Sequence, residues 1–290
     1  MTYTSHDLID DLFTALVRRP SEHPTDSTQY QEWRDALAPV IKDRFANARG
    51  TPAPFGPLGP LSLPYFEMGA ITSLELFGLD ELILFAFYYA NRSRYRRVVD
   101  FGTNIGLHTI MMARCGFEVR SFEPDPIHIA QLRENLWRND VQTDLRQAAV
   151  SLEDGQAEFV RVKGNTTGSH IGGAKADPYG DLDRFKVDIT AAAPHLHWAD
   201  LAKIDIEGHE ATLIKGLPPE TWLNTDAMME IGTPENAKDI FDHLSGTQAN
   251  MFSQKRGWGR VEQLEDVPTS HREGSVFLTG KSQVPWGAEG

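Results

Sequence analysis

From residue 97 to residue 231 the chain alternates short runs of β-favouring residues with amphipathic segments, and this alternation limits the folds open to it. The strand-like runs are 97–101, 118–122, 143–150, 201–206 and 227–231, and the helix-like segments are 105–115, 127–138 and 210–216. Strands that alternate with helices predict an α/β fold, in which helices cover both faces of a parallel sheet. A helix is expected at 234–244. Two last strands, near 250–254 and 275–279, have no obvious helix between them, which predicts an antiparallel hairpin at one edge.

The first 64 residues have a different character. Apolar residues three and four apart predict helices over 5–19 and 29–48. Residues 51–64 carry five prolines, a composition that disfavours regular structure. We therefore place a domain boundary there: 1–64 is an N-terminal helical extension with a Pro/Gly-rich linker, and 65–290 is the domain that carries the chemistry. That domain is expected to begin with a strand pair near 66–76 and a hydrophobic helix over 79–92.

The charge of the chain argues against two classes of partner. Among its 290 residues, 28 are Lys or Arg and 41 are Asp or Glu, which gives a formal net charge of −13. Nucleic acids and anionic membranes select basic surfaces, so we expect neither as the main partner. The N-terminus lacks the pattern of a signal peptide, and the longest apolar stretch is far shorter than the ~20 residues that cross a bilayer. We expect a soluble cytoplasmic protein. The single cysteine, Cys115, excludes an intramolecular disulfide and a cysteine-based zinc cluster.

The segment Asp100–Gly106, DFGTNIG, closes one predicted strand and opens the next predicted helix. Open α/β sheets bind ligands at this position, beyond the carboxyl ends of the strands. Glycines at 102 and 106 let the backbone turn sharply and approach a ligand. The spacing differs from the Gly-x-Gly-x-x-Gly dinucleotide fingerprint, and no Walker lysine follows, so a pyrophosphate cradle is disfavoured. Asp100 suits a ligand with a cationic amino group. An ordinary strand-to-helix turn is the alternative interpretation.

Charged residues also follow two later strands. Glu123 lies 17 residues after Gly106, where a carboxylate can hold both hydroxyls of a ribose, and Asp125 can cap the following helix. The segment Lys203–Glu210, KIDIEGHE, places alternating charges on a strand flanked by apolar sequence. Charges there are costly unless they are paired or used, so the segment indicates either the lining of an active site or a salt-bridged edge strand.

Taken together, DFGTNIGLHT, FEPDP and KIDIEGHE resemble the FkbM family of S-adenosylmethionine-dependent methyltransferases, over roughly residues 65–280. The resemblance implies a class I methyltransferase (Rossmann-like) fold, with a seven-stranded sheet and an antiparallel last strand. It implies S-adenosylmethionine as the cofactor and methyl donor. The chain departs from the family pattern in one place: the Leu-Asp pair usual some fifteen residues before the third motif is not evident at 191–194. This departure concerns the acceptor side of the site.

The resemblance also implies roles for individual residues. The turn holding the methionine part of the donor would comprise Asp100, Gly102, Thr103, Asn104 and Gly106. Glu123, with Pro124, would bind the ribose, and Gln147 and Ala148 would flank the adenine. Asp205 would border both the methionine part and the acceptor.

Methylation of a hydroxyl group requires removal of its proton, so a base is expected near the acceptor. His209 is the leading candidate because its unperturbed pKa lies near neutrality, with helix capping or orientation of Glu207 as the alternative. Asp205 and Glu207 compete for the role of base, or could together hold a divalent metal, which the sequence does not otherwise indicate. The Gly-rich stretch 163–180 indicates an acceptor-binding lid or a plain surface loop. As a lid it would bring Asn165 and His170 to the acceptor, and Glu207 is expected there too.

These observations predict an S-adenosylmethionine-dependent O-methyltransferase that acts on a hydroxyl of a sugar or secondary metabolite by in-line displacement. Two other classes stay open: a nicotinamide-dependent oxidoreductase on a Rossmann-like fold, and a non-catalytic partner that retains the fold. The expected partners are a small-molecule acceptor and a second copy of the chain, which would form a homodimer through the N-terminal helices.

Overall fold

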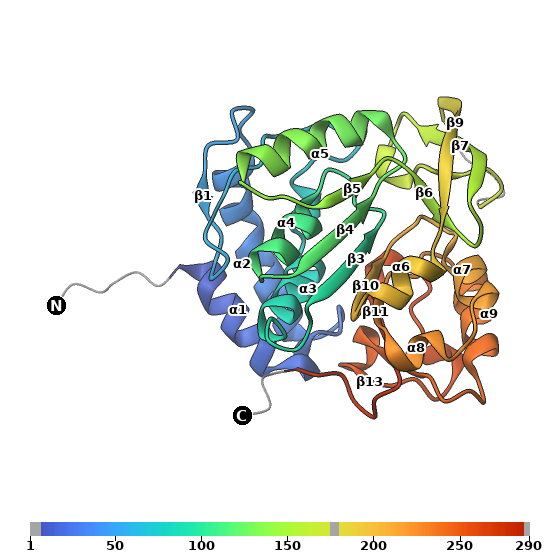
Figure 1. The fold of residues 1–290 in the computed structure, drawn as a ribbon. Helices are drawn as coiled ribbons and strands as arrows, with labels where there is room; N and C mark the ends of the chain where they lie inside the picture. The colour runs from blue at the N-terminus through green and yellow to red at the C-terminus, as the bar shows by residue number, and fades with distance from the viewer. Residues whose placement is uncertain (1–6, 175–179, 287–290) are drawn as a thin grey trace.

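The computed structural model describes residues 7–174 and 180–286, and its centre is a sheet of eight strands (Figure 1). In spatial order the strands are β13-β12-β14-β11-β10-β3-β4-β5. Their bounds are β3 Arg97–Phe101, β4 Glu118–Phe122, β5 Asp144–Arg146, β10 Leu201–Ile204, β11 Asp226–Met229, β12 Asn250–Ser253, β13 Gly259–Arg260 and β14 Val276–Thr279. Within this sheet β5, β4, β3, β10 and β11 pair in parallel, and β14 is antiparallel to both β11 and β12.

This strand order is that of a class I methyltransferase fold: a parallel sheet whose reversed last strand inserts between the fifth and sixth. The predicted fold class is therefore confirmed. The antiparallel pairing of the last two long strands is also confirmed, but their place in the sheet differs from the prediction. Strand β14 lies inside the sheet between β11 and β12 and does not form an edge hairpin, and the short β13 adds an eighth strand at that edge.

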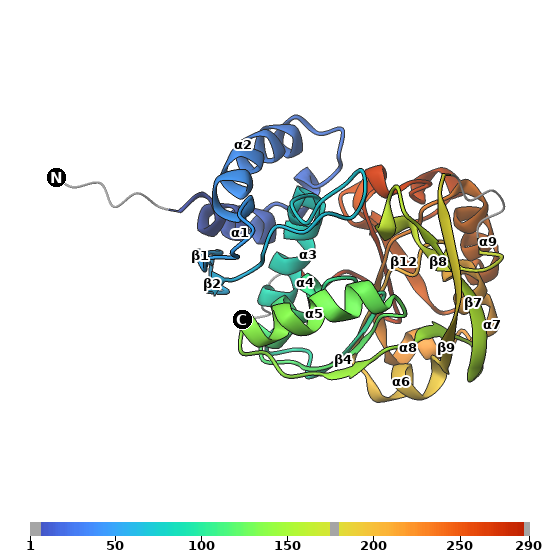
Figure 2. The same ribbon diagram turned by 90° about the horizontal axis from the view of Figure 1, so that it is seen from above.

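Helices cover both faces of this sheet, as predicted (Figure 2). Side chains alternate along each strand, so that Val98 and Leu201 face one layer of helices while Val99 and Ala202 face the other. The first layer contains α1 Leu8–Arg18, α2 Thr28–Phe45, α3 Leu79–Ala90, α4 Leu107–Arg114 and α5 Pro126–Arg138. The second contains α6 Ala193–Trp198, α7 Glu210–Gly216, α8 Thr221–Asn224 and α9 Pro234–Leu244.

The N-terminal helices belong to the first layer and share its apolar core. Asp7 caps α1 by accepting a hydrogen bond from the Ile9 amide at 2.9 Å, and the apolar face of α1 packs against α3. In the linker, Phe55 packs its ring 5.5 Å from that of Phe77. Contrary to the prediction of no regular structure there, β1 Ala53–Pro54 and β2 Pro60–Leu61 pair in a short ladder, because glycines with positive φ reverse the chain between them. The division into two domains at residue 64 stays a prediction.

A second, four-stranded sheet stands at one end of the first, and the sequence did not predict it. It comprises β6 Ala149–Ser151, β7 Gly155–Val162, β8 His170–Ile171 and β9 Leu182–Ala191, in the order β6-β9-β7-β8. The strand predicted over 143–150 is in fact two strands, β5 and β6, which belong to different sheets. The strand pair predicted near 66–76 is also wrong: that segment makes two isolated bridges, Glu67 to Thr72 and Gly69 to Asn165, before a 3₁₀ turn at Glu75–Phe77.

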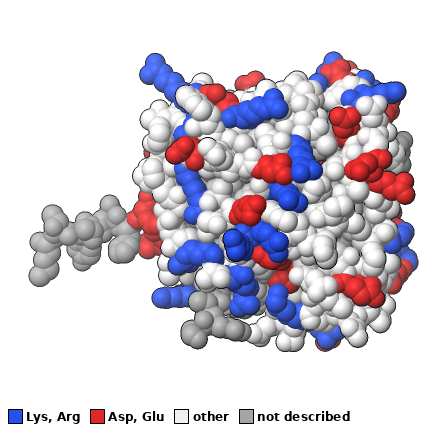
Figure 3. Space-filling model, viewed as in Figure 1, with Lys and Arg blue, Asp and Glu red and all other residues white. Residues whose placement is uncertain are grey.

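The surface seen in Figure 3 mixes both signs of charge and is not uniformly acidic. Several of the basic side chains of the central strands are paired locally: Arg97 lies 3.6 Å from Asp200, and Arg120 lies 3.5 Å from Asp144. Arg120 also lies over the ring of Trp198, 3.8 Å from its centroid. Within the described ranges, every helix is too short or too polar to span a bilayer.

His23 connects the N-terminal helices to the end of the chain. Its Nε2 lies 3.0 Å from the Leu16 carbonyl oxygen, and its Nδ1 accepts a hydrogen bond from Trp258 Nε1 at 2.8 Å. The ring is fully buried and meets that of Trp286 edge-on at 4.9 Å. Nε2 must therefore carry the proton, and a second proton on Nδ1 would oppose the indole N–H. Burial lowers the pKa of His23 to about 4.

We predict a pH-dependent loss of stability from this histidine. Between pH 6.5 and 4 the unfolded chain protonates His23 and the folded chain does not, so acidification lowers the free energy of unfolding, by up to about 3 kcal/mol. Urea unfolding across this pH range should show a smaller decline for His23→Gln than for the wild type. The exposed His197→Gln is the control and should retain the wild-type decline. Equal declines in the wild type and His23→Gln would contradict the assignment.

Candidate functional site

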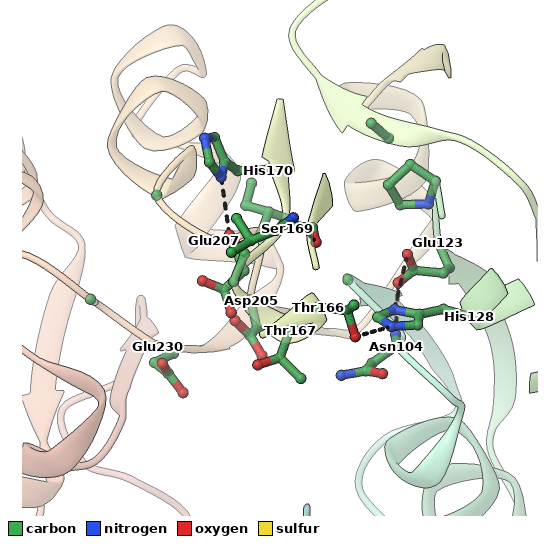
Figure 4. Close-up of a pocket in the computed structure, with 18 of the residues that line it drawn as sticks. Asn104, Glu123, His128, Thr166, Thr167, Ser169, His170, Asp205, Glu207 and Glu230 are labelled. Carbon is green, nitrogen blue, oxygen red and sulfur yellow. Dashed lines mark hydrogen bonds and ion pairs between the residues drawn. The ribbon is translucent and has the colours of Figure 1, made fainter. Parts of the chain in front are cut away.

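A cavity of about 630 Å³ lies at the carboxyl ends of β3, β4 and β10. This is the position at which open α/β sheets bind ligands, and the volume falls within the ~300–1,000 Å³ of small-molecule sites. Its walls come from the loops after these strands, from the second sheet and from the 3₁₀ turn Thr166–Gly168 (Figure 4). The cavity brings together nine of the predicted site residues: Gly102, Asn104, Glu123, Pro124, Ala148, Asn165, His170, Asp205 and Glu207.

Gly102 allows the first and third motifs to touch. Its φ is +80°, and a Cβ atom at this position would lie 1.8 Å from the carbonyl oxygen of Asp205. Thr103 ties the same turn to β4, because its hydroxyl accepts a hydrogen bond from the Phe122 amide at 3.0 Å. Thr103 is buried and Gly106 packs against Leu132, so neither lines the cavity, although both were predicted to contact the donor.

Lys203 neutralises the carboxylates behind this turn. It stands opposite Asp100 in the register of β10 and β3, and its Nζ lies 3.1 Å from Asp205 Oδ2 and 3.2 Å from the Gly102 carbonyl oxygen. Burial acts to lower the pKa of Lys203, but the carboxylates of Asp205 and Asp100 outweigh it and raise that pKa above its ordinary value. The predicted contact of Asp100 with a ligand is not supported, because its side chain is fully buried, accepts a hydrogen bond from Thr109 and does not line the cavity.

Glu123 is held at the end of β4 by two backbone amides. Its carboxylate accepts hydrogen bonds from the Asn104 amide at 2.8 Å and from the Asp125 amide at 2.9 Å. Burial raises the pKa of Glu123 to about 8. Asp125 caps α5 through the Ile127 amide, as predicted, and also pairs with Arg161 at 2.6 Å. Asn104 adopts a left-handed conformation with φ 55°, and its buried Oδ1 accepts no hydrogen bond from the part of the chain that the structure describes.

The cavity wall is acidic. Seven carboxylate residues line it: Glu75, Glu81, Glu123, Asp205, Glu207, Glu210 and Glu230. Among the described residues, no Lys or Arg lines it. Such a wall attracts a cation and repels the pyrophosphate of a dinucleotide. Asp205 is paired with Lys203, and within residues 7–174 and 180–286 no group of three or more His, Cys, Asp or Glu side chains is arranged to hold a metal ion.

His209 and Gln147 lie elsewhere. His209 Nε2 is 2.9 Å from the Ser151 hydroxyl oxygen, and the ring does not line the cavity, so the base role predicted for it does not fit this geometry. His209 is positioned as the N-cap of α7, but its side chain makes no capping hydrogen bond. Gln147 is exposed, whereas its neighbour Ala148 lines the cavity. Of the stretch 163–180 predicted as a lid or surface loop, residues 175–179 lie outside the described residues.

Several lining residues were missed by sequence reasoning. The most informative are Glu81 on α3, His128 on α5 and Glu230 after β11. His128 Nδ1 lies 3.8 Å from Glu123 Oε1, and its Nε2 lies 3.0 Å from the Thr166 hydroxyl oxygen. Glu230 had a usable signal, since it is a single carboxylate at the end of a buried strand, as Glu123 is. Figure 4 shows His170 and Glu207 pointing toward one another across the cavity.

No family model and no curated protein matches this chain. Among solved structures, it is similar to the SAH-bound methyltransferase PaMTH1 of Podospora anserina (10% identity, 69% of this chain and 79% of that one, TM-score 0.37). It is also similar to an O-methyltransferase of Bacillus cereus in complex with SAH (11% identity, 67% and 78%, TM-score 0.35) and to cofactor-bound Rv0187 from MTB (13% identity, 67% and 76%, TM-score 0.36). The fold class rests on the strand order of this chain itself.

We predict that Gly102→Ala destabilises the protein by at least about 3 kcal/mol, because the added methyl group meets the backbone of Asp205. The matched control is Gly116→Ala, which has a similar φ of +88° but no atom within 4 Å of the added carbon. It should lose only the ~1–2 kcal/mol of a left-handed alanine. Urea unfolding of both variants measures the difference, and equal losses would show that the approach to Asp205 does not constrain position 102.

Proposed function

We propose that this protein is an S-adenosylmethionine-dependent methyltransferase that methylates a hydroxyl group of a small molecule, and that its relatives lie in the FkbM family. The observation that carries the proposal is the acidic cavity at the carboxyl ends of β3, β4 and β10, in a sheet of methyltransferase topology. A donor with a positively charged sulfur and an ammonium group suits such a wall.

The residues of the cavity fit this donor. The unpartnered Oδ1 of Asn104 can accept a hydrogen bond from an ammonium group, and the turn at Gly102 leaves no side chain in the way. Glu123 can accept hydrogen bonds from ribose hydroxyls, because each of its oxygens retains a free lone pair beside its backbone partner. Pro124 and Ala148 offer an apolar surface for a flat base.

When bound, the donor supplies a methyl group on a positively charged sulfur. The protein then has to hold the acceptor in line with that group and to exclude water. Positioning alone can lower the activation barrier by ~7–11 kcal/mol. The second sheet contributes to the enclosure: Ser169 and His170 precede and begin β8, both are buried, and both line the cavity. Asn165, His170 and Glu207 are the residues that we propose contact the acceptor.

The two other classes considered from the sequence are less well supported. A nicotinamide cofactor carries a pyrophosphate, for which the described wall offers no Lys or Arg. A non-catalytic protein that retains the fold would have no need of an open cavity lined by carboxyl groups whose pKa values are raised by burial. Such groups are costly to maintain. The proposed cytoplasmic location and the proposed homodimer through the N-terminal helices rest on the sequence alone.

We predict that S-adenosylhomocysteine binds the wild type and that Glu123→Ala weakens this binding about 5- to 100-fold, the cost of leaving the ribose hydroxyls without a hydrogen-bond partner. Isothermal titration calorimetry measures both affinities. The control is Glu118→Ala, which removes an exposed carboxylate at the opposite end of the same strand and should bind like the wild type. Binding of NADH with none of S-adenosylhomocysteine would reject the proposal.

The acceptor can be sought directly once donor binding is established. A panel of sugars, polyols and phenols is incubated with the protein and S-adenosylmethionine, and donor-dependent formation of S-adenosylhomocysteine is followed. Turnover with a hydroxyl compound supports O-methylation, whereas turnover with amines alone would redirect the proposal to N-methylation.

A further inference from the structure

Glu230 occupies a junction between two cavities. It directly follows β11 and lines the main cavity, beside Asp205 (Figure 4). It also lines a small second cavity of about 20 Å³, enough for about one water molecule. Glu81, Asp205, Glu230 and His271 line both cavities, so the small one opens behind the wall of the large one. His271 is exposed, which gives the small cavity a polar group that reaches solvent.

The other acidic residues of the wall have partners. Glu75 accepts hydrogen bonds from Thr72, Glu81 lies 2.7 Å from His108 Nε2, and Asp205 pairs with Lys203. Glu210 accepts hydrogen bonds from the Ile206 and Gly208 amides. Glu123 is held by backbone amides, and Glu207 also has a partner. By contrast, the Glu230 carboxyl group makes no hydrogen bond or ion pair with any residue that the structure describes, so it is available to a ligand.

The electrostatic environment opposes ionisation of this group in the empty cavity. Burial raises the pKa of Glu230 well above its ordinary value, and the carboxylates of Asp205, Glu207 and Glu81 raise it further. Lys203 on β10 acts in the opposite direction. The remaining titratable groups around it are Asp80 on α3 and His271, which line the small cavity. A cation placed in the main cavity would therefore favour ionisation of Glu230.

We infer that Glu230 is the catalytic base that takes the proton from the acceptor hydroxyl. This inference rests on the proposed methyl transfer. As the acceptor oxygen bonds to the methyl carbon, the carbon–sulfur bond breaks and its electron pair stays on sulfur. The hydroxyl proton passes to a carboxylate oxygen of Glu230. When the donor binds, the small cavity offers the proton displaced from Glu230 a route toward His271 and solvent. The positive charge of the donor thus prepares the base, and the proton taken from the acceptor returns Glu230 to its neutral form.

The first test measures protons and needs no acceptor. S-adenosylmethionine and S-adenosylhomocysteine differ by a methyl group and the charge on sulfur. Calorimetry at pH 7, in buffers of different ionisation enthalpy, gives the number of protons released on binding each. In the wild type, we expect binding of S-adenosylmethionine to release up to one proton more than binding of S-adenosylhomocysteine. The difference should vanish in Glu230→Gln, which still binds S-adenosylhomocysteine, and persist in the exposed control Glu235→Gln.

The outcomes separate this inference from the proposed function. If neither compound binds the wild type, the proposed function fails and this inference fails with it. If both bind with the same proton release, or if the difference persists in Glu230→Gln, only the assignment of Glu230 is overturned.

A second test examines catalysis with the acceptor found by the panel above. Glu230→Gln should lower kcat by 10²- to 10⁴-fold, the usual contribution of a general base, while leaving the Kd of S-adenosylhomocysteine unchanged. The rise of kcat with pH in the wild type should disappear in the variant. A variant that keeps the wild-type kcat and pH profile would overturn the assignment, because a residue that only shapes the wall would not control the pH profile.

Discussion

The approach of the Gly102 turn to the Asp205 backbone fixes the geometry of the whole site. The carboxyl ends of β3 and β10 are adjacent because these strands pair in parallel, but the loops beyond them can touch only where no side chain intervenes. Lys203 completes the junction by contacting the Gly102 carbonyl and the Asp205 carboxylate from below. A buried ammonium without these partners would be strongly destabilising, so the cation and its carboxylates hold one another in place.

This junction also explains the charge of the cavity. Since Lys203 is occupied behind the wall, seven carboxylate residues and no Lys or Arg of the described chain face the ligand. Burial raises the pKa of Glu123 to about 8 and that of Glu210 to about 7, which shows that the empty cavity tolerates negative charge poorly. A positively charged ligand relieves this cost. The same arrangement therefore favours a sulfonium donor over a dinucleotide and links donor binding to the ionisation of Glu230.

The sequence predicted the ends of β3 and β4, and therefore that the motifs meet, because parallel strands place their carboxyl ends at one edge. Strand β10 ends at Ile204, two residues before the predicted end, so Asp205 lies in the loop after the strand. The sequence did not predict which way each side chain turns. Asp100 faces the helical layer and Lys203, and His209 faces Ser151, since strand register and the loop after β10 decide these directions. The second sheet was missed because β7 and β9 alternate weakly and pair over long range. Insertion of β14 likewise depends on long-range pairing that no local pattern records.

A crystal structure of the protein with S-adenosylhomocysteine would show whether these loops enclose one donor site. We expect the ligand to occupy the cavity of about 630 Å³ and to contact Gly102, Glu123 and Asp205 together. A ligand bound on another surface, or an empty cavity in crystals saturated with the compound, would contradict this expectation.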